Sequence, residues 1–362
     1  MNRNYLRTAP VAVALTLALG LSACGASNEE PATGAEGSLA GTLNGAGSSA
    51  QEAAVAAMAQ GFQTTNADVT VNYDPVGSGG GREQFIDGGT DFGGTDSTLD
   101  DEEIAAAAER CGSDVIEVPT YVSPIAVIFN VDGVKDLNLT PAVVGEIFAG
   151  TITNWNDPLI AADNPDANLP DGDITPVHRS DESGTTGNFT EYLDQASDGS
   201  WDKGSVEVWP FESGEAAEGT SGVVAAVNGG TGTIGYADAS QAGDLGVAKI
   251  KVGDEFVAYS PEAAAKALDV SKQVDSGSES IIVYELDRKT TEAGAYPLIL
   301  VSYQIACTTY EDQEKADLVK GWLTYAASAE GQAKSAEGAG SAPISEDLSG
   351  KITAIVEKID AA

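Results

Sequence analysis

Short apolar runs alternate with longer stretches of helical periodicity from residue 39 onward. The runs typical of strands lie at 39–44, 68–73, 116–130, 174–178, 233–236 and 298–305, with a shorter run that ends at Phe92. We expect the long run to be interrupted at Ser123-Pro124, because proline has no N–H for a strand ladder. Helices are predicted at 51–63, 82–86, 101–110, 142–148, 189–193, 222–227, 261–268 and 315–327. This alternation predicts an α/β fold with helices on both faces of a sheet.

The length and the remaining segments indicate how the chain is organised. Its 362 residues suggest two domains or lobes. Residues 154–173 include Pro158, Pro165 and Pro170 and predict a long ordered loop in the second half. The sequence shows no repeat with a period of about 20–50 residues, no heptads and no membrane span after the first two dozen residues.

The N-terminal segment predicts an export signal followed by a tether. Arg3 and Arg7 precede an apolar run at 9–20 that is too short for a stable membrane helix. The string Leu-Ser-Ala-Cys at 21–24 resembles the lipobox of bacterial lipoproteins, which implies a signal peptide at 1–23 and acylation of Cys24. An ordinary secretory signal with a chance cysteine is the alternative. Residues 24–38 are small and polar, so we expect a lipidated flexible tether on the outer face of a membrane.

Charge excludes several classes of partner and of site. The chain has 56 Asp and Glu against 18 Lys and Arg, a formal charge of −38, and one His. Such a surface repels nucleic acid and anionic lipid headgroups, so we expect no nucleic acid and membrane contact only through the lipid anchor. A single His cannot build a two-His zinc site or a multi-His hydrolase centre, and we expect no metal and no cofactor. Hydrophobic residues at 42% still allow a sizeable core.

Two cysteines remain after the tether, Cys111 and Cys307. Thiols of an exported chain tend to oxidise, and both residues flank predicted strands, so the two can be neighbours. A bond between them would close a loop of 196 residues, for which chain entropy gives about 5 kcal/mol at most. Two separate buried thiols are the alternative.

Four segments place small and hydroxyl residues directly before a predicted helix. They are Gly-Ala-Gly-Ser-Ser-Ala at 45–50, Gly-Ser-Gly-Gly-Gly at 77–81, Asp-Phe-Gly-Gly-Thr-Asp-Ser-Thr at 91–98 and His-Arg-Ser-Asp-Glu-Ser-Gly-Thr-Thr at 178–186. A helix N-terminus presents unpaired N–H groups and partial positive charge, and glycine lets a ligand approach them. Each segment therefore indicates an oxyanion cradle. For any one of them ordinary helix capping is the alternative.

Two charged residues make this pattern more specific. The planar donor fork of Arg179 suits a tetrahedral oxyanion, and Asp181 could pair with the guanidinium and hold its plane. Asp96 would repel an anion unless that anion brings a proton to donate. An Asp in the cradle therefore favours phosphate, which is protonated at neutral pH, over sulfate, which is not. The alternative is that Asp96 caps the following helix through residues 97–98.

In order and spacing, the four segments resemble the PstS family, the phosphate-binding proteins of bacterial high-affinity phosphate ABC transporters. The stretch at 147–155 and Gly235-Tyr236 agree as well, and the resemblance runs from residue 39 nearly to the C-terminus. The acidity and Cys24 are similar to lipoprotein forms of actinobacterial type. The resemblance implies phosphate contacts from Ser49, Ala50, Ser78, Asp96, Arg179, Ser183, Gly184 and Thr185.

The sequence departs from the family pattern at two places. Ser49 and Ala50 stand where the family usually has Thr and Phe, but Ser keeps the hydroxyl and a backbone contact from residue 50 needs no particular side chain. Glu182 stands where Gly is common, and we expect its side chain to point to solvent.

The resemblance implies a two-lobed periplasmic-binding-protein-like fold of type II, with mixed sheets, flanking helices and a ligand cleft between the lobes. Residues 39–121 and 290–362 would form a discontinuous first lobe and 122–289 the second, with crossings near 120–123 and 289–296. The first lobe would supply the ligands up to Asp96, and the second would supply the turn at 179–185. Binding would therefore be coupled to closure.

The expected function is that of a monomeric lipoprotein outside the cytoplasm that captures inorganic phosphate and delivers it to a membrane-embedded ABC permease. Three alternatives stay open: a phosphoester hydrolase with His178 as base, a binder of another tetrahedral oxyanion, and a surface lipoprotein with an interaction role. Against a hydrolase, the sequence has no His cluster, no Gly-x-x-x-x-Gly-Lys-Ser/Thr loop and no Asp-rich metal cage at the cradle. We therefore expect no enzyme and no catalytic residue.

Overall fold

The sheet is built around one long buried strand, β4 (Val115–Asn130). The computed structural model describes residues 39–362, so the predicted signal peptide, Cys24 and tether lie outside the described residues. Nine strands form one mixed sheet in the order β2-β1-β3-β14-β4-β8-β6-β7, and β9 also pairs with β4. The other strands of this sheet are β1 (Ala40–Gly47), β2 (Asp68–Asp74), β3 (Phe92–Thr95), β6 (Thr175–Arg179), β7 (Glu215–Ala217), β8 (Thr233–Asp238), β9 (Gly246–Val247) and β14 (Ile299–Cys307).

The long strand changes partner in its middle. Residues up to Pro124 pair antiparallel with β14, and residues from Ile125 pair antiparallel with β8. The expected interruption at Ser123-Pro124 is wrong, because the strand continues through it. Pro124 sits where the ladder passes from one neighbour to the other, a position at which a missing N–H is tolerated.

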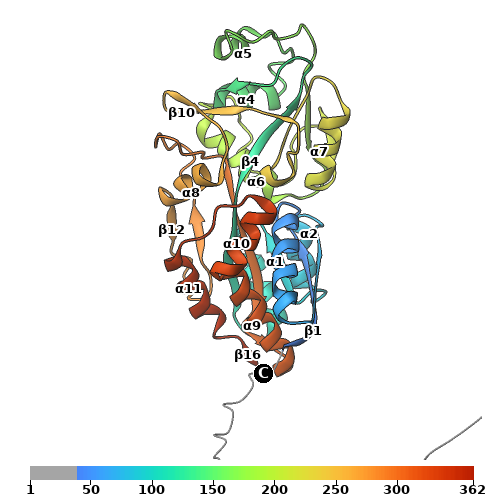
Figure 1. Cartoon of the computed structure of the whole chain (residues 1–362), viewed down its shortest axis with the longest axis vertical. Helices are drawn as coiled ribbons and strands as arrows, with labels where there is room; N and C mark the ends of the chain where they lie inside the picture. Colours follow the sequence, from blue (N-terminus) through green and yellow to red (C-terminus); the bar gives the residue numbers. More distant parts are fainter. Residues whose placement is uncertain (1–38) are drawn as a thin grey trace, which may run out of the picture. The chain divides into compact units, whose positions relative to one another are not determined.

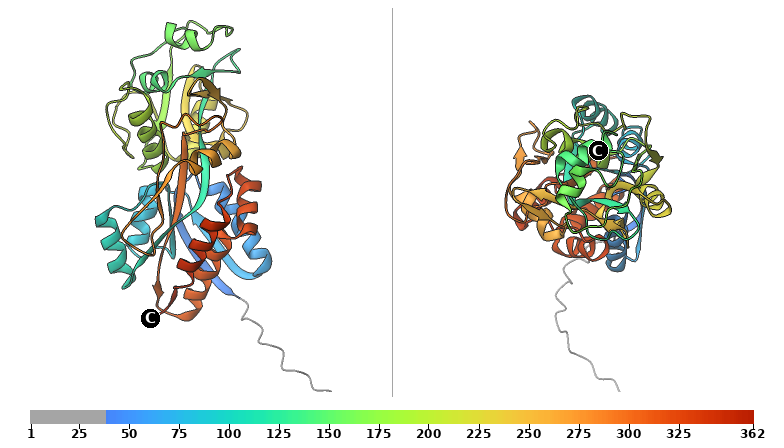
Figure 2. Two further views of the ribbon diagram at one scale, coloured as in Figure 1. Left: turned by 90° about the vertical axis from the view of Figure 1, so that its left-hand side faces the viewer. Right: turned by 90° about the horizontal axis from the view of Figure 1, so that it is seen from above.

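Helices cover both faces of the sheet, as the alternating pattern predicts (Figures 1 and 2). One end of the sheet is covered by α1 (Glu52–Thr65), α2 (Ser78–Ile86), α3 (Asp101–Cys111), α9 (Gln313–Ala327), α10 (Ala329–Ala339) and α11 (Glu346–Val356). The other end carries α4 (Pro141–Phe148), α5 (Pro158–Asp163), α6 (Gly184–Ala196) and α7 (Gly219–Gly229). The expected α/β class is therefore confirmed.

Shorter elements complete the described chain. They are β5 (Asn138–Leu139), the 3-10 turn η1 (Ala239–Gln241), β10 (Lys249–Val252), β11 (Glu255–Val257), α8 (Pro261–Asp269), β12 (Lys272–Val274), β13 (Val283–Glu285), β15 (Thr309–Tyr310) and β16 (Asp360–Ala361). The β12–β13 connection lies against the start of β4. Glu117 N donates to Ser280 O, and Ile282 N donates to Glu117 O.

Three parts of the second half differ from the sequence prediction. The expected loop at 154–173 contains the helix α5, and Asn154 and Asp173 form a bridge that closes it. Helices α10 and α11 were not predicted. Within residues 39–362, no helix is both long and apolar enough to cross a bilayer, and no cluster of His, Cys, Asp or Glu is arranged to hold a metal ion.

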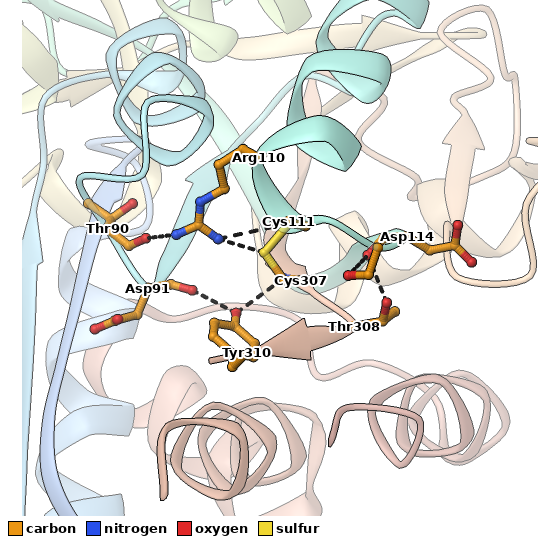
Figure 3. Close-up of a disulfide and its surroundings, with 9 residues drawn as sticks. Thr90, Asp91, Arg110, Cys111, Asp114, Cys307, Thr308 and Tyr310 are labelled. Atoms are coloured by element: carbon orange, nitrogen blue, oxygen red, sulfur yellow. Dashed lines mark hydrogen bonds between the residues drawn. A yellow bond between two sulfur atoms is a disulfide. The ribbon is translucent and has the colours of Figure 1, made fainter. Parts of the chain in front are cut away.

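The predicted disulfide between Cys111 and Cys307 is confirmed (Figure 3). It joins the last residue of α3 to the last residue of β14, with the two Cα atoms 5.4 Å apart. Arg110 lies beside it, donating from Nη2 to Thr90 O at 2.8 Å and stacking over Phe85. The bond therefore ties α3 to the middle of the sheet.

Candidate anion-binding site

The topology directs the four glycine- and hydroxyl-rich segments toward one place. Strands β1, β2 and β3 are parallel, and the first three segments contain or follow their carboxyl ends. The fourth segment lies at the carboxyl end of β6, which runs opposite to β3. Three antiparallel pairings lead from β3 through β14 and β4 to β8, and β8 is parallel to β6. Both sets of carboxyl ends therefore face the middle of β4, where ligand sites of α/β sheets form.

Direct contacts show that the segments meet around Asp96. Thr185 Oγ1 donates to Asp96 Oδ2 at 2.9 Å, and Asp96 N donates to Ser78 Oγ at 3.1 Å. A Cβ at Gly184 would lie 2.7 Å from Ser78 Oγ and 2.9 Å from Asp96 Cβ. Only glycine allows this approach of the α6 backbone. The second, third and fourth segments are therefore in contact, and their predicted ligands are buried.

The first turn of α6 presents two donors to this place. Ser183 caps the helix by accepting from Thr186 N at 3.2 Å, and Gly187 N donates to Ser183 O. The N–H groups of Gly184 and Thr185 precede the first intrahelical hydrogen bond and are left for a ligand. Together with the helix dipole they favour an anion. Capping by Ser183 therefore does not compete with anion binding at this turn, because the two would use different groups.

Arg179 is held by Asp181 as the sequence suggests. Nε donates to Asp181 Oδ1 at 2.7 Å and Nη2 donates to Asp181 Oδ2, while Arg179 itself is 2% exposed. Burial opposes ionisation of Asp181, but the hydrogen bonds and charge of Arg179 outweigh it and lower the pKa of that carboxyl. No hydrogen bond among the described residues uses Arg179 Nη1. The pair therefore fixes the plane of the guanidinium and leaves one donor edge for an anion.

Asp96 accepts from hydroxyl groups that several segments supply. Besides Thr185, Ser302 Oγ on β14 donates to Oδ1. Burial raises the pKa of Asp96, against these hydrogen bonds and the charge of Arg179, which lower it. A carboxylate has about four lone-pair sites, so these two hydroxyls leave room for a proton donor on a ligand. Asp96 does not cap α3, because Asp100 does so in a capping box with Glu103.

The first segment is arranged differently from the expectation. The hydroxyl of Ser49 is 2.9 Å from Thr220 Oγ1 and accepts from Thr220 N at 3.0 Å, so it faces the start of α7. The N–H of Ala50 donates to Ser48 Oγ at 3.1 Å. Both predicted residues are buried, but Ser49 Oγ is hydrogen-bonded to Thr220 and the N–H of Ala50 to Ser48.

The sequence interpretation missed several residues of the site. Gly219 N donates to Asp181 Oδ1, so the start of α7 joins the Arg179–Asp181 pair. The Gly-Thr-Ser-Gly sequence at 219–222 places small and hydroxyl residues at a helix start, as the four segments do, so this pattern could have predicted a fifth segment at the site. Asn188 donates to Asp96 O at 2.7 Å and accepts from the buried Arg288 at its own Oδ1. No local pattern distinguishes Asn188, Arg288 or Ser302.

Glu182 corrects one expectation. Its side chain is 53% exposed, but its carboxylate does not simply point to solvent, because Arg82 Nη2 donates to Oε1 at 3.1 Å. Its backbone O also accepts from Gly79 N at 3.2 Å. Glu182 therefore joins the fourth segment to the second.

His178 is a packed residue. Its ring stacks on Trp209 with centroids 4.9 Å apart, and Nδ1 lies 2.9 Å from Arg179 O. The side chain is buried within an aromatic cluster that includes Tyr236 and Phe189. This environment supports the strand that ends at Arg179 and offers no path to a substrate oxygen.

Comparisons with known proteins give relatives over most of the chain. A profile described as a PBP superfamily domain matches residues 32–330. Phosphate-binding protein PstS 3 of Mycobacterium leprae is 38% identical over 286 residues, 78% of each chain. Phosphate-binding protein PstS 2 of Mycobacterium tuberculosis is 34% identical over 354 residues, which cover 94% of this chain and 95% of that one.

A solved structure shows the same fold. A high-affinity periplasmic phosphate-binding protein (PfluDING) bound with phosphate superposes with a TM-score of 0.70 at 20% identity, covering 87% of this chain and 93% of that chain. The family match, the two mycobacterial relatives and this fold agree with one another. The chain therefore belongs to the PBP superfamily and, within it, to the PstS family of phosphate-binding proteins.

Proposed function

We propose that this protein captures inorganic phosphate outside the cytoplasm and delivers it to an ABC-type permease. The observation that carries the proposal is the buried Arg179, held in plane by Asp181, beside the open N–H groups at the start of α6 and facing a segment that holds Asp96. The names of the mycobacterial relatives and the bound phosphate of the PfluDING protein support the same ligand.

The proposed ligands divide by the chemistry they supply. Donors are Arg179 Nη1, the N–H groups of Gly184 and Thr185 and the hydroxyls of Ser78 and Ser183. Ser49 and Ala50 would join them only by exchanging their present partners, Thr220 and Ser48, for phosphate. Asp96 is the acceptor for the proton that phosphate carries and sulfate lacks. Micromolar affinity requires about −8 kcal/mol. Several charge-assisted hydrogen bonds at roughly 1.5–3 kcal/mol each supply that after the free energy of closure is subtracted.

We propose two lobes, residues 39–121 with 290–362 and residues 122–289, that close over the ligand. The contacts of Asp96 with Thr185 and of Gly79 with Glu182 cross between these ranges, which supports a site completed by closure. Acylation of Cys24, a tether at 24–38 and a monomeric state complete the proposal. The lipid would keep the protein on the outer face of the membrane, next to the permease.

Binding without catalysis is the proposed activity. The one histidine, His178, is packed against Trp209, which argues against its acting as a general base. Incubation with a chromogenic phosphate ester separates binding from hydrolysis. We expect no release of chromophore, and release that Arg179→Ala abolishes would favour the hydrolase instead.

Calorimetric titration with phosphate tests the proposal. The wild type should bind one phosphate per chain, and Arg179→Ala should abolish tight binding. Arg179→Lys should bind weakly, because a lysine cannot make the paired contact with Asp181. Lys251→Ala removes the same charge from β10 and is the matched control. Wild-type affinity in Arg179→Ala would overturn the site, and competition with arsenate and sulfate would identify another preferred oxyanion.

A further inference from the structure

Arg82, in the first turns of α2, meets three carboxylates and one hydroxyl from four separate places in the sequence. Nε donates to Glu103 Oε1 at 2.7 Å, and Nη2 donates to Glu207 Oε2 at 2.9 Å and to Glu182 Oε1 at 3.1 Å. Nη1 donates to Thr95 Oγ1 at 3.1 Å. The residue is 5% exposed, so a nearly buried guanidinium uses all of its nitrogen atoms to connect these segments.

Three of these partners, Thr95, Glu182 and Glu207, adjoin a proposed phosphate ligand, although Arg82 hydrogen-bonds to none of the ligands. Thr95 precedes Asp96, and Glu182 precedes Ser183. Glu207 also fixes Ser183 through its backbone, because Ser183 N donates to Glu207 O at 3.1 Å. Arg82 lies on the helix that begins with Ser78. One side chain therefore connects three of the four segments from behind the site.

The four partners fall on two sides of the middle of β4. Glu103 and Thr95 come from residues 39–121, as Arg82 does, whereas Glu182 and Glu207 come from residues 122–289. Only the last two ion pairs hold one range against the other. Glu207 is the better buried of the two, with 21% of its side chain exposed against 53% for Glu182, so solvent screens it less.

Arg82 allows the carboxylates of Glu103, Glu182 and Glu207 to lie close together. Three carboxylates against one guanidinium leave two negative charges in excess, and without the guanidinium the carboxylates would repel one another. Burial alone would lower the pKa of Arg82, but the charges and hydrogen bonds of Glu207 and Glu103 outweigh it and raise that pKa. The guanidinium therefore stays charged wherever the protein is folded.

We propose that Arg82, with Glu182 and Glu207, is a latch that holds the segments around the phosphate in contact and slows phosphate release without touching the ion. The proposal rests on phosphate capture as the function. Arg82 is a positioning residue here, and Glu182 is the latch partner that directly precedes Ser183 in the sequence.

Glutamine substitutions test the latch with matched changes of charge. Glu182→Gln, Glu207→Gln and the double variant each weaken ion pairs that cross between the two ranges. Glu103→Gln weakens the ion pair on the same side as Arg82 and keeps the capping box, since glutamine also serves at that position. All variants are first compared with the wild type by thermal melting to confirm that they fold.

The first measurement is the release of radiolabelled phosphate into an excess of unlabelled phosphate. We expect the release rate to rise about fivefold in Glu207→Gln, less in Glu182→Gln and about tenfold or more in the double variant, because a neutral acceptor replaces a charged one. Glu103→Gln should stay within about twofold of the wild type. Unchanged release in the double variant, or an equal rise in Glu103→Gln, would overturn the latch.

The second measurement needs no phosphate. Amide hydrogen exchange of the phosphate-free protein should speed up at Gly79 in the double variant, because its N–H donates to Glu182 O across the two ranges, and should not change in Glu103→Gln. If the wild type binds no phosphate, the proposed function fails while this result can still hold. If phosphate binds and exchange is the same in all variants, the latch alone is wrong.

Discussion

Thr185 Oγ1 donates a 2.9 Å hydrogen bond to Asp96 Oδ2 and joins the first turn of α6 to the turn that follows β3. The two residues are 89 positions apart in the sequence and come from opposite ends of the sheet. The same carboxyl accepts from Ser302 on β14, the strand that runs beside β4. Asp96 is thus the acceptor at which the separate parts of the site converge, and the proposed selectivity for phosphate depends on its carboxylate.

Asp96→Asn should relax discrimination against sulfate. The carboxylate repels a fully ionised anion, whereas an amide does not, so sulfate should begin to compete with phosphate in calorimetric titrations at neutral pH. Asp194→Asn, at an exposed position near the C-terminal end of α6, removes the same charge away from the site and should leave the discrimination against sulfate unchanged. If sulfate stays excluded just as strongly in Asp96→Asn, proton acceptance by Asp96 is not the source of selectivity.

Gly184→Ala should weaken phosphate binding by about tenfold or more, which is about 1.4 kcal/mol. The added Cβ would lie 2.7 Å from Ser78 Oγ, so the start of α6 must move away from the second and third segments. Gly222→Ala in α7 is the control, because its Cβ would make only ordinary contacts, the nearest with the backbone of Ala217 in β7 at 3.6 Å. Calorimetry compares the two variants. Equal affinities would show that the close approach of α6 is dispensable.

Replacing Cys111 and Cys307 together by alanine should lower the free energy of unfolding by about 2–5 kcal/mol. The bond constrains a separation of 196 residues in the unfolded chain and ties α3 to β14 in the folded one. Urea unfolding of the double variant, beside the wild type with and without dithiothreitol, measures the loss. Reduced wild type should match the double variant, and a difference below about 1 kcal/mol would contradict the chain-entropy account.

Glu117→Gln should remove a pH-dependent loss of stability. Burial raises the pKa of Glu117 to about 8, while Leu99 N, which donates to Oε1, lowers it in part. Because the unfolded pKa is about 4.3, the unfolded state loses this proton first, and wild-type stability falls as the pH rises through the interval up to about 8.

Urea unfolding at several values between about pH 5 and pH 8 measures that effect. The stability of Glu117→Gln relative to the wild type should increase steadily with pH, on top of a constant offset from the amide. Glu109→Gln, an exposed change on α3, should show no such trend. A constant difference for Glu117→Gln would mean that the carboxyl ionises normally in the folded protein.

Local sequence patterns predicted most strands and helices up to α9 but not the two helices after it. Helix α10 contains Gly331 and Gly338, which local propensity disfavours by about 1 kcal/mol each. The structure gives the reason for both. A Cβ at Gly338 would lie 2.5 Å from Ala57 Cβ on α1, and one at Gly331 would lie 2.0 Å from Tyr325 O. Tertiary packing selects these glycines, and a single sequence carries no sign of it.

The candidate site divides in the same way. Arg179, Asp181, Ser183 and Gly184 could be predicted because N-caps, glycines and a paired arginine leave a local pattern. Ser302 could not, because the register that places Tyr303 opposite Thr95 brings Ser302 to Asp96 across 206 positions. The contacts of Arg82 could not be predicted for a similar reason, since each of its partners lies in a different segment. Such contacts are created by strand order and register, which local periodicity does not encode.

The passage of β4 from one neighbour to the other at Pro124 has a mechanical consequence. A loop hinge swings almost freely, but a buried strand that is hydrogen-bonded on either side of its midpoint can rotate only by twisting its backbone. Such a strand behaves as a torsion spring, in which elastic energy grows with the opening angle. The two ends of the sheet would then move through a small, reproducible arc, and the open and closed forms would differ by a twist rather than by a rearrangement.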